Sequence, residues 1–85
     1  MDLKEQFEAA VAESKQLSSR PSNDILLKLY SLYKQAVDGD APEEGPTGMF
    51  DIVGKAKHNA WASLQGKGSE ECMQAYIDLI QELKG

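Results

Sequence analysis

The sequence predicts an all-α domain of four helices. Four segments carry apolar residues at spacings of three and four, and Gly, Pro and Ser separate these segments from one another. No segment shows the alternating β-branched pattern of a strand. Eighty-five residues are enough for one modest core and too few for a second, so residues 1–85 are expected to form a single domain.

The first helix is predicted over residues 2–17. Asp2 is a plausible N-cap with Glu5 three residues later, and Lys15 lies near the C-terminal end, where a cation suits the helix dipole. Its apolar stripe consists of Leu3, Phe7, Ala10, Val11, Ser14 and Leu17. A turn over residues 18–24 follows, in which Pro21 disfavours a helical conformation of the residue before it.

The second helix is predicted from about Asn23 to Val37, with Ser22, Asn23 and Asp24 available to cap it. Its predicted core stripe consists of Leu26, Leu29, Tyr33, Ala36 and Val37. A neighbouring stripe holds Leu27, Tyr30 and Lys34. Because apolar residues cover more than half of the circumference, this helix is expected to pack on two sides or to line a pocket.

The second half of the chain predicts a long connection and two further helices. Gly39 ends the second helix, and the connection over residues 40–50 is too rich in Gly and Pro to be helical; Met49 and Phe50 are expected to dock onto the body. The third helix is predicted from about Asp51, its N-cap, to Gly66, with the stripe Ile52, Val53, Ala56, Ala60 and Leu64 and with Trp61 beside it. The fourth is predicted to be capped by Ser69 and to carry the stripe Cys72, Met73, Tyr76, Ile77, Ile80 and Leu83.

Composition excludes several classes of function. A net charge of −5 argues against a general nucleic-acid binder, which needs an excess of Lys and Arg. Apolar runs are far shorter than the roughly 20 residues of a membrane span, and the first residues lack the apolar run of a secretory signal. A lone cysteine, Cys72, cannot form an internal disulfide. We therefore expect a soluble protein of the cytoplasm.

The sequence also argues against an enzyme. The chain has one histidine, His58, and Cys72 in a helical pattern reads as a small buried residue rather than a nucleophile. These residues are too few for a metal cluster, and no glycine-rich phosphate loop occurs, since GPTG lacks the required spacing and flanking strand. The prediction is a non-catalytic protein with no metal and no cofactor.

Binding chemistry is better supported. Tyr30, Tyr33 and Lys34 share one helical face, and Lys55 and Lys57 lie in the first turns of the third helix, where the dipole disfavours cations. Trp61 follows Lys57 by four residues, and Tyr76 lies near the apolar stripe of the fourth helix. Aromatic rings and ammonium groups together suit a ligand with a planar ring and phosphates. The alternative interpretation is that the rings fill the core and the lysines are solvated.

Three runs of sequence, LYSLYKQAVDGD, GPTGMFDIVGKAKHNAW and CMQAYIDLIQELK, resemble the acyl-CoA-binding protein family. The resemblance extends from Phe7 to Lys84, and its motifs YxxYKQAxxGD and GKAKxxAW are specific. It implies a four-helix bundle with up-down-down-up connectivity, in which the connection after Asp40 is the overhand loop between helices two and three. On this basis residues 1–85 are expected to form one acyl-CoA-binding domain.

The resemblance also implies a function and a set of site residues. It implies a non-catalytic, monomeric carrier that binds long-chain acyl-CoA thioesters, buffers and transports them, and delivers them to enzymes that use acyl-CoA. The residues matching the family's binding positions are Lys15, Tyr30, Tyr33, Lys34, Val53, Lys57 and Tyr76. Among these, Lys34, Lys57 and Tyr30 are implied to hold the 3′-phosphate end of CoA, and Tyr76 to contact the adenine.

Three departures from the family pattern concern the preferred acyl chain and the loop. His58 stands where many members have tryptophan, and Val11 stands where a small alanine is usual. The overhand loop of this chain is one residue longer than in the family pattern, and it has Gly45 where an arginine is common. No departure removes a phosphate-binding group, so CoA binding is expected to survive while chain-length preference stays open. A protein-interaction module with the same fold is the alternative, and a thioester hydrolase lacks a nucleophile–base pair.

Overall fold

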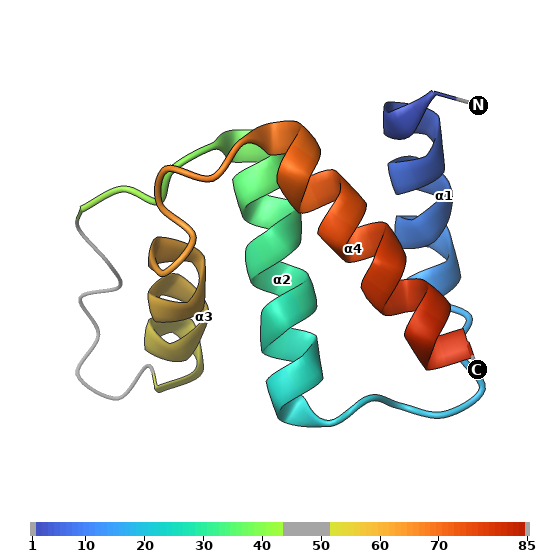
Figure 1. Cartoon of the computed structure of the whole chain (residues 1–85). Helices are drawn as coiled ribbons and strands as arrows, with labels where there is room; N and C mark the ends of the chain where they lie inside the picture. The colour runs from blue at the N-terminus through green and yellow to red at the C-terminus, as the bar shows by residue number, and fades with distance from the viewer. Residues whose placement is uncertain (1, 44–51, 85) are drawn as a thin grey trace.

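The computed structural model describes residues 2–43 and 52–84, and these ranges contain four α-helices and no strand. The helices are α1 (Leu3–Ser14), α2 (Asn23–Asp38), α3 (Ile52–Ala62) and α4 (Ser69–Lys84). In Figure 1, α1 and α4 run in one direction and α2 and α3 in the opposite direction, which confirms the up-down-down-up order. None of these described helices is long and apolar enough to cross a membrane.

Helix α2 is the central element of the bundle. Helix α4 packs against both α1 and α2, and α3 packs against the other side of α2 (Figure 1). Within the described ranges the backbones of α1 and α2 do not approach each other closely, so α4 bridges them. This arrangement leaves room for cavities on either side of α2.

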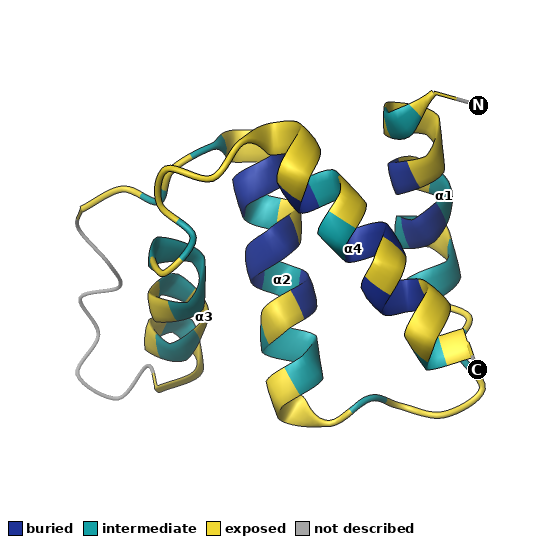
Figure 2. Cartoon of the chain, in the orientation of Figure 1, coloured by how far each residue is buried: buried dark blue, intermediate teal, exposed yellow. Residues whose placement is uncertain are grey.

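The hydrophobic core lies where α4 meets α1 and α2. Its buried members are Phe7, Ala10, Leu29, Leu32, Ala36, Cys72, Tyr76, Ile77, Leu79 and Ile80. Figure 2 shows these buried faces on α1, α2 and α4, whereas α3 displays only half-buried and exposed residues. The described residues of α3 therefore add no fully buried side chain to the core.

The beginnings of α1 and α2 follow the sequence prediction. The Asp2 carboxylate accepts a hydrogen bond from the Glu5 amide at 2.8 Å, and the Ser22 hydroxyl accepts one from the Ile25 amide at 3.4 Å. Helix α1 ends at Ser14, three residues earlier than predicted. The Lys15 amide donates to the carbonyls of Ala12 and Glu13 and so does not continue the α-helical pattern. Lys15 is thus the C-cap of α1, at the dipole end that favours a cation.

The predicted core stripe of α2 was wrong at two residues. Tyr33 is 39% exposed and Val37 is 54% exposed, whereas Leu32 and Gln35 are buried in their place. The reason is that α4 docks on the side of α2 that carries Leu29, Leu32 and Ala36. The α1 backbone does not approach α2 closely, so Val37 stays open and Tyr33 is covered only in part, by the stacked ring of Phe7. Periodicity identified an apolar helix but not the direction of its partner.

Two predictions at the ends of α3 and α4 are also corrected. Helix α3 ends at Ala62 rather than near Gly66, and the chain turns at Gly66, whose φ of 88° suits glycine. Ser69 does not cap α4: the Gly68 carbonyl accepts from the Cys72 amide, and the Ser69 hydroxyl donates to the Ala36 carbonyl of α2 at 2.6 Å.

The predicted cap Asp51 and the docking of Met49 and Phe50 lie outside the described residues, as does the loop residue Gly45.

A small polar cluster joins the end of α2 to the turn between α3 and α4. The Gln35 side-chain amide donates to the Asp40 carboxylate at 2.8 Å and to the Lys67 carbonyl at 3.1 Å. The Gly66 amide donates to the same Asp40 oxygen at 2.9 Å. These bonds hold the pKa of Asp40 below its usual value of 3.8. We call Gln35, Asp40, Gly66 and Lys67 the polar clasp, because they fix the α3–α4 turn against α2.

Candidate functional site

One cavity between α1, α2 and α4 gathers four of the predicted site residues. Lys15, Tyr30, Tyr33 and Tyr76 all line it, and its volume is about 310 Å³. The remaining lining residues are Val11, Ser14, Leu26 and Leu29. We call it the tyrosine cavity, since three phenol rings from two helices face one space with a lysine at its edge.

A second cavity lies between α2 and α3 and is predominantly apolar. Its volume is about 550 Å³, and its lining residues are Arg20, Asn23, Leu26, Leu27, Tyr30, Ile52, Val53, Ala56 and Lys57. Three of the predicted site residues, Tyr30, Val53 and Lys57, belong to it. Tyr30 and Leu26 line both this cavity and the tyrosine cavity. This α2–α3 cavity and the tyrosine cavity are therefore neighbours that share the Tyr30 wall.

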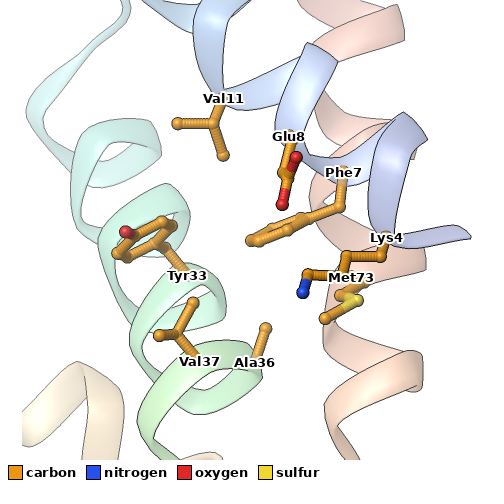
Figure 3. A pocket seen from close by; sticks show the side chains of 8 residues that line it. All are labelled: Lys4, Phe7, Glu8, Val11, Tyr33, Ala36, Val37 and Met73. Atoms are coloured by element: carbon orange, nitrogen blue, oxygen red, sulfur yellow. The ribbon is translucent and has the colours of Figure 1, made fainter.

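A third cavity, of about 470 Å³, extends the tyrosine cavity along α1 and α2 (Figure 3). Phe7 of α1 and Tyr33 of α2 both line it, and the other lining residues are Lys4, Glu8, Val11, Ala36, Val37 and Met73. Val11 and Tyr33 line this cavity and the tyrosine cavity alike. The exposure of Tyr33 is thus explained, because its ring forms a wall between two open spaces.

The Phe7 ring of α1 contacts two of the three tyrosine rings. Phe7 stacks on Tyr33 with ring centroids 5.9 Å apart and meets Tyr76 edge-on at 5.2 Å. Phe7 and Tyr76 are buried. The aromatic wall of the tyrosine cavity is therefore supported from behind by core packing.

Two lysines lie over aromatic rings where α2 meets α3. The Lys57 ammonium of α3 is 5.3 Å from the centroid of the Tyr30 ring of α2, and the Lys34 ammonium of α2 is 5.0 Å from the Trp61 ring of α3. The Trp61 indole N–H donates to the Gly39 carbonyl at 2.7 Å, which fixes the orientation of its ring. These contacts place two cations at the boundary of the two helices, and one of them, Lys57, lines the α2–α3 cavity.

The two lysines differ in their partners. The Lys34 ammonium forms an ion pair with Asp38 one turn later on α2, and this hydrogen bond raises the pKa of Lys34 above 10.5. Lys57 has no carboxylate partner among the residues that the structure describes. Lys34 is not among the residues that line the three cavities, whereas each of the other six predicted residues lines at least one of them.

The positions that depart from the family pattern lie in two different places. Val11 lines the tyrosine cavity and the cavity of Figure 3. His58 lines none of the three cavities: its Nε2 lies 2.8 Å from the Pro42 carbonyl and must carry the proton, since a carbonyl only accepts. His58 therefore ties α3 to the segment that follows α2.

The described residues around the cavities offer surfaces for noncovalent binding. Cys72 is fully buried, and burial raises the pKa of its thiol. Among the described residues, no three His, Cys, Asp or Glu side chains cluster in a way that could hold a metal ion. What the cavities offer is aromatic surface, apolar surface and ammonium groups.

Two residues that sequence reasoning did not select contact predicted site residues. Phe7 was expected only in a core stripe, yet it supports Tyr33 and Tyr76. Asp38 was not selected at all, although its spacing of four residues from Lys34 is a recognisable signal for an ion pair on a helix.

Comparison with known proteins connects this geometry to one family. The family model described as "Acyl CoA binding protein" matches residues 4–80. The chain is 47% identical over 77 residues to acyl-CoA-binding protein homolog 1 of Caenorhabditis elegans, covering 91% of this chain and 88% of the relative. It is 46% identical over 81 residues to the acyl-CoA-binding protein homolog of Drosophila melanogaster, with 95% and 93% covered. The crystal structure of Oryza sativa Acyl-CoA-Binding Protein 2 superposes with a TM-score of 0.88 at 38% identity, covering 95% of this chain and 87% of that one.

Proposed function

The chain belongs to the acyl-CoA-binding protein family, and we propose that it binds long-chain acyl-CoA thioesters and serves as their non-catalytic carrier. The observation that carries this proposal is the pair of adjoining cavities that share Tyr30. One is aromatic with a lysine at its edge, and the other is apolar with a lysine at its edge. An acyl-CoA molecule has the same two parts, a charged nucleotide and a hydrocarbon tail.

The nucleotide end fits the tyrosine cavity. Tyr30, Tyr33 and Tyr76 offer ring faces and hydroxyl groups to an adenine, and Lys15 offers an ammonium group beside them. Lys57, which lies over the Tyr30 ring and lacks a carboxylate partner among the described residues, is available to a phosphate. We assign Lys34 to the same phosphate group, which then competes with Asp38 for the Lys34 ammonium.

The acyl tail fits the α2–α3 cavity. Leu26 and Leu27 form one wall, and the opposite wall contains Ile52 and Val53, which are 76% and 65% exposed. Each buried methylene contributes about 0.8 kcal/mol, so covering these side chains with a hydrocarbon chain gains free energy for both protein and ligand. The proposal thus explains why Ile52 and Val53 are exposed in the free protein.

We further propose that residues 1–85 act as one acyl-CoA-binding domain, as a monomer in the cytoplasm, without a metal or cofactor. By holding acyl-CoA, such a carrier lowers the free ligand concentration and supplies the ligand to enzymes that use it. The net charge of −5 supports a partner other than nucleic acid.

Titration calorimetry with dodecanoyl-CoA, dodecanoate and CoA tests the proposal. We expect dodecanoyl-CoA to bind far more tightly than either fragment, because only the whole molecule occupies both cavities. Equal affinity for the free fatty acid would contradict the proposal. Release of free CoA during incubation would instead indicate a thioester hydrolase.

A matched pair of lysine variants tests the site. Lys57→Gln is expected to weaken dodecanoyl-CoA binding by at least about tenfold, the value of one hydrogen bond to a charged group. Lys55→Gln makes the same change two residues away, at an exposed residue that lines none of the three cavities, and is expected to bind normally. Circular dichroism should show unchanged helix content in both. Equal effects of the two variants would remove Lys57 from the site.

A further inference from the structure

Asp38 forms an ion pair with Lys34, one of the residues assigned to the ligand phosphate. Its carboxylate pairs with the Lys34 ammonium, which lies over the Trp61 ring at the same time. The Trp61 indole is itself fixed by its hydrogen bond to the Gly39 carbonyl. Lys34 is therefore held from two sides, by a carboxylate of its own helix and by a ring of α3.

Helix stability gives little reason for an aspartate at this position. Asp38 is the last residue of α2, where the dipole disfavours a negative charge. The order of the pair, with the lysine N-terminal to the acid, is the less favourable orientation on a helix. Aspartate also has a low intrinsic helix propensity. The contact with Lys34 is thus the clearest consequence of having Asp38 in this turn.

We propose that Asp38 is an internal counterion that holds Lys34 in the unliganded protein and competes with the ligand phosphate for its ammonium group. This inference rests on the proposed function and adds a positioning residue to it. Asp38 takes the place of the phosphate before the ligand arrives, and the phosphate must displace it. The carboxylate thereby sets how tightly the phosphate end of the ligand is held.

The exposure of the pair makes this exchange feasible. The Lys34 side chain is 27% exposed and that of Asp38 is 45% exposed, so a phosphate can approach without any unfolding of α2. A carboxylate left beside a bound phosphate also repels it, because both are anions within a Debye length of about 8–10 Å. Both effects weaken binding, so removing the charge of Asp38 strengthens it.

Titration of dodecanoyl-CoA into Asp38→Asn tests the inference. The variant is expected to bind about two- to fivefold more tightly than the wild type, the range of one exposed ion pair. Asp38→Glu keeps the charge and the spacing, and is expected to restore wild-type affinity. The gain of Asp38→Asn should shrink when the titration is repeated in 0.5 M salt, where the Debye length is shorter.

Two control variants separate the proposed role from a general charge effect. Asp78→Asn makes the same charge change on α4, where Asp78 bonds Gln74, and is expected to leave affinity unchanged. In a Lys34→Gln background, Asp38→Asn is expected to have a smaller effect, because the competition for the ammonium group is absent and only the repulsion between carboxylate and phosphate remains. An unchanged affinity of Asp38→Asn, an equal gain in Asp78→Asn, or a gain that is equally large without Lys34 would each overturn the inference. A wild-type protein that fails to bind dodecanoyl-CoA would overturn the proposed function instead.

Discussion

Helices α3 and α4 pack on opposite sides of α2 by different means. Helix α4 contributes five buried residues, Cys72, Tyr76, Ile77, Leu79 and Ile80. The described residues of α3 contribute none, and α3 is held largely by the Trp61 hydrogen bond to Gly39, the His58 contact with Pro42 and two cation–π contacts. One helix is fixed by the core and the other by polar and aromatic contacts at its surface.

This difference separates stability from binding. Burial of apolar surface is the dominant favourable term in folding, so the α1–α2–α4 side carries the stability of the domain. Helix α3 retains apolar side chains for another purpose, since Ile52 and Val53 stay open to the α2–α3 cavity. We infer that a bound acyl chain packs against this helix and covers its exposed apolar side chains.

The largest change in stability is expected from truncating a side chain of α4 in the core. Ile80→Ala removes a fully buried side chain and should lower the free energy of unfolding by about 2–5 kcal/mol. Ile52→Ala makes the same change at an exposed residue of α3 and should alter stability by less than about 0.5 kcal/mol. Urea denaturation followed by circular dichroism measures both.

Binding should reverse the order of this pair. Where Ile80→Ala remains folded, its affinity for dodecanoyl-CoA should stay close to wild type, whereas Ile52→Ala should bind more weakly, because a wall of the tail cavity is lost. Similar losses of stability in the two variants would contradict the division between α3 and α4.

A smaller effect is expected at the polar clasp. Gln35→Ala removes both hydrogen bonds that the buried Gln35 amide donates, and should lower the free energy of unfolding by about 1–3 kcal/mol. Gln74→Ala provides the matched control, because Gln74 is exposed and its side chain donates to Asp78 on the same helix. Urea denaturation with equal losses in both glutamine variants would show that the clasp adds nothing to the fold.

The smallest effect is the pH dependence of the same clasp. The Gly66 amide and the Gln35 side chain lower the pKa of Asp40 in the folded state below its unfolded value near 3.8. The carboxylate therefore adds stability above about pH 4, and this contribution is lost as the pH falls through the folded pKa. The stability difference between wild type and Asp40→Asn, measured by urea denaturation from pH 6 to pH 3, should shrink on acidification. A difference that is constant over this range would contradict the assignment.

Much of the fold could be predicted because the caps and breakers are local. Asp2 and Ser22 begin α1 and α2 as expected, and Gly39, with φ of 81°, ends α2. The direction of packing could not be predicted in the same way. The exposure of Tyr33 and Val37 depends on where α1 lies relative to α2, and that arrangement is set by α4.

The candidate site divides along similar lines. Sequence reasoning selected Tyr30, Tyr33 and Tyr76 from residue type and spacing, and the structure places them around one cavity. It did not predict that Asp38 would form an ion pair with Lys34, nor that the Ser69 hydroxyl would donate to α2 rather than cap α4. Both depend on which of several partners a polar side chain finds after folding.

Hydrogen exchange of the backbone amides, with and without dodecanoyl-CoA, tests the central claim most directly. In the free protein, amides of α3 should exchange faster than those of α4, because α3 lacks buried side chains. Dodecanoyl-CoA should then protect α2 and α3 most strongly and change the core amides of α4, around Ile80, least. Slow exchange of α3 in the free protein, or protection confined to α4, would contradict the account.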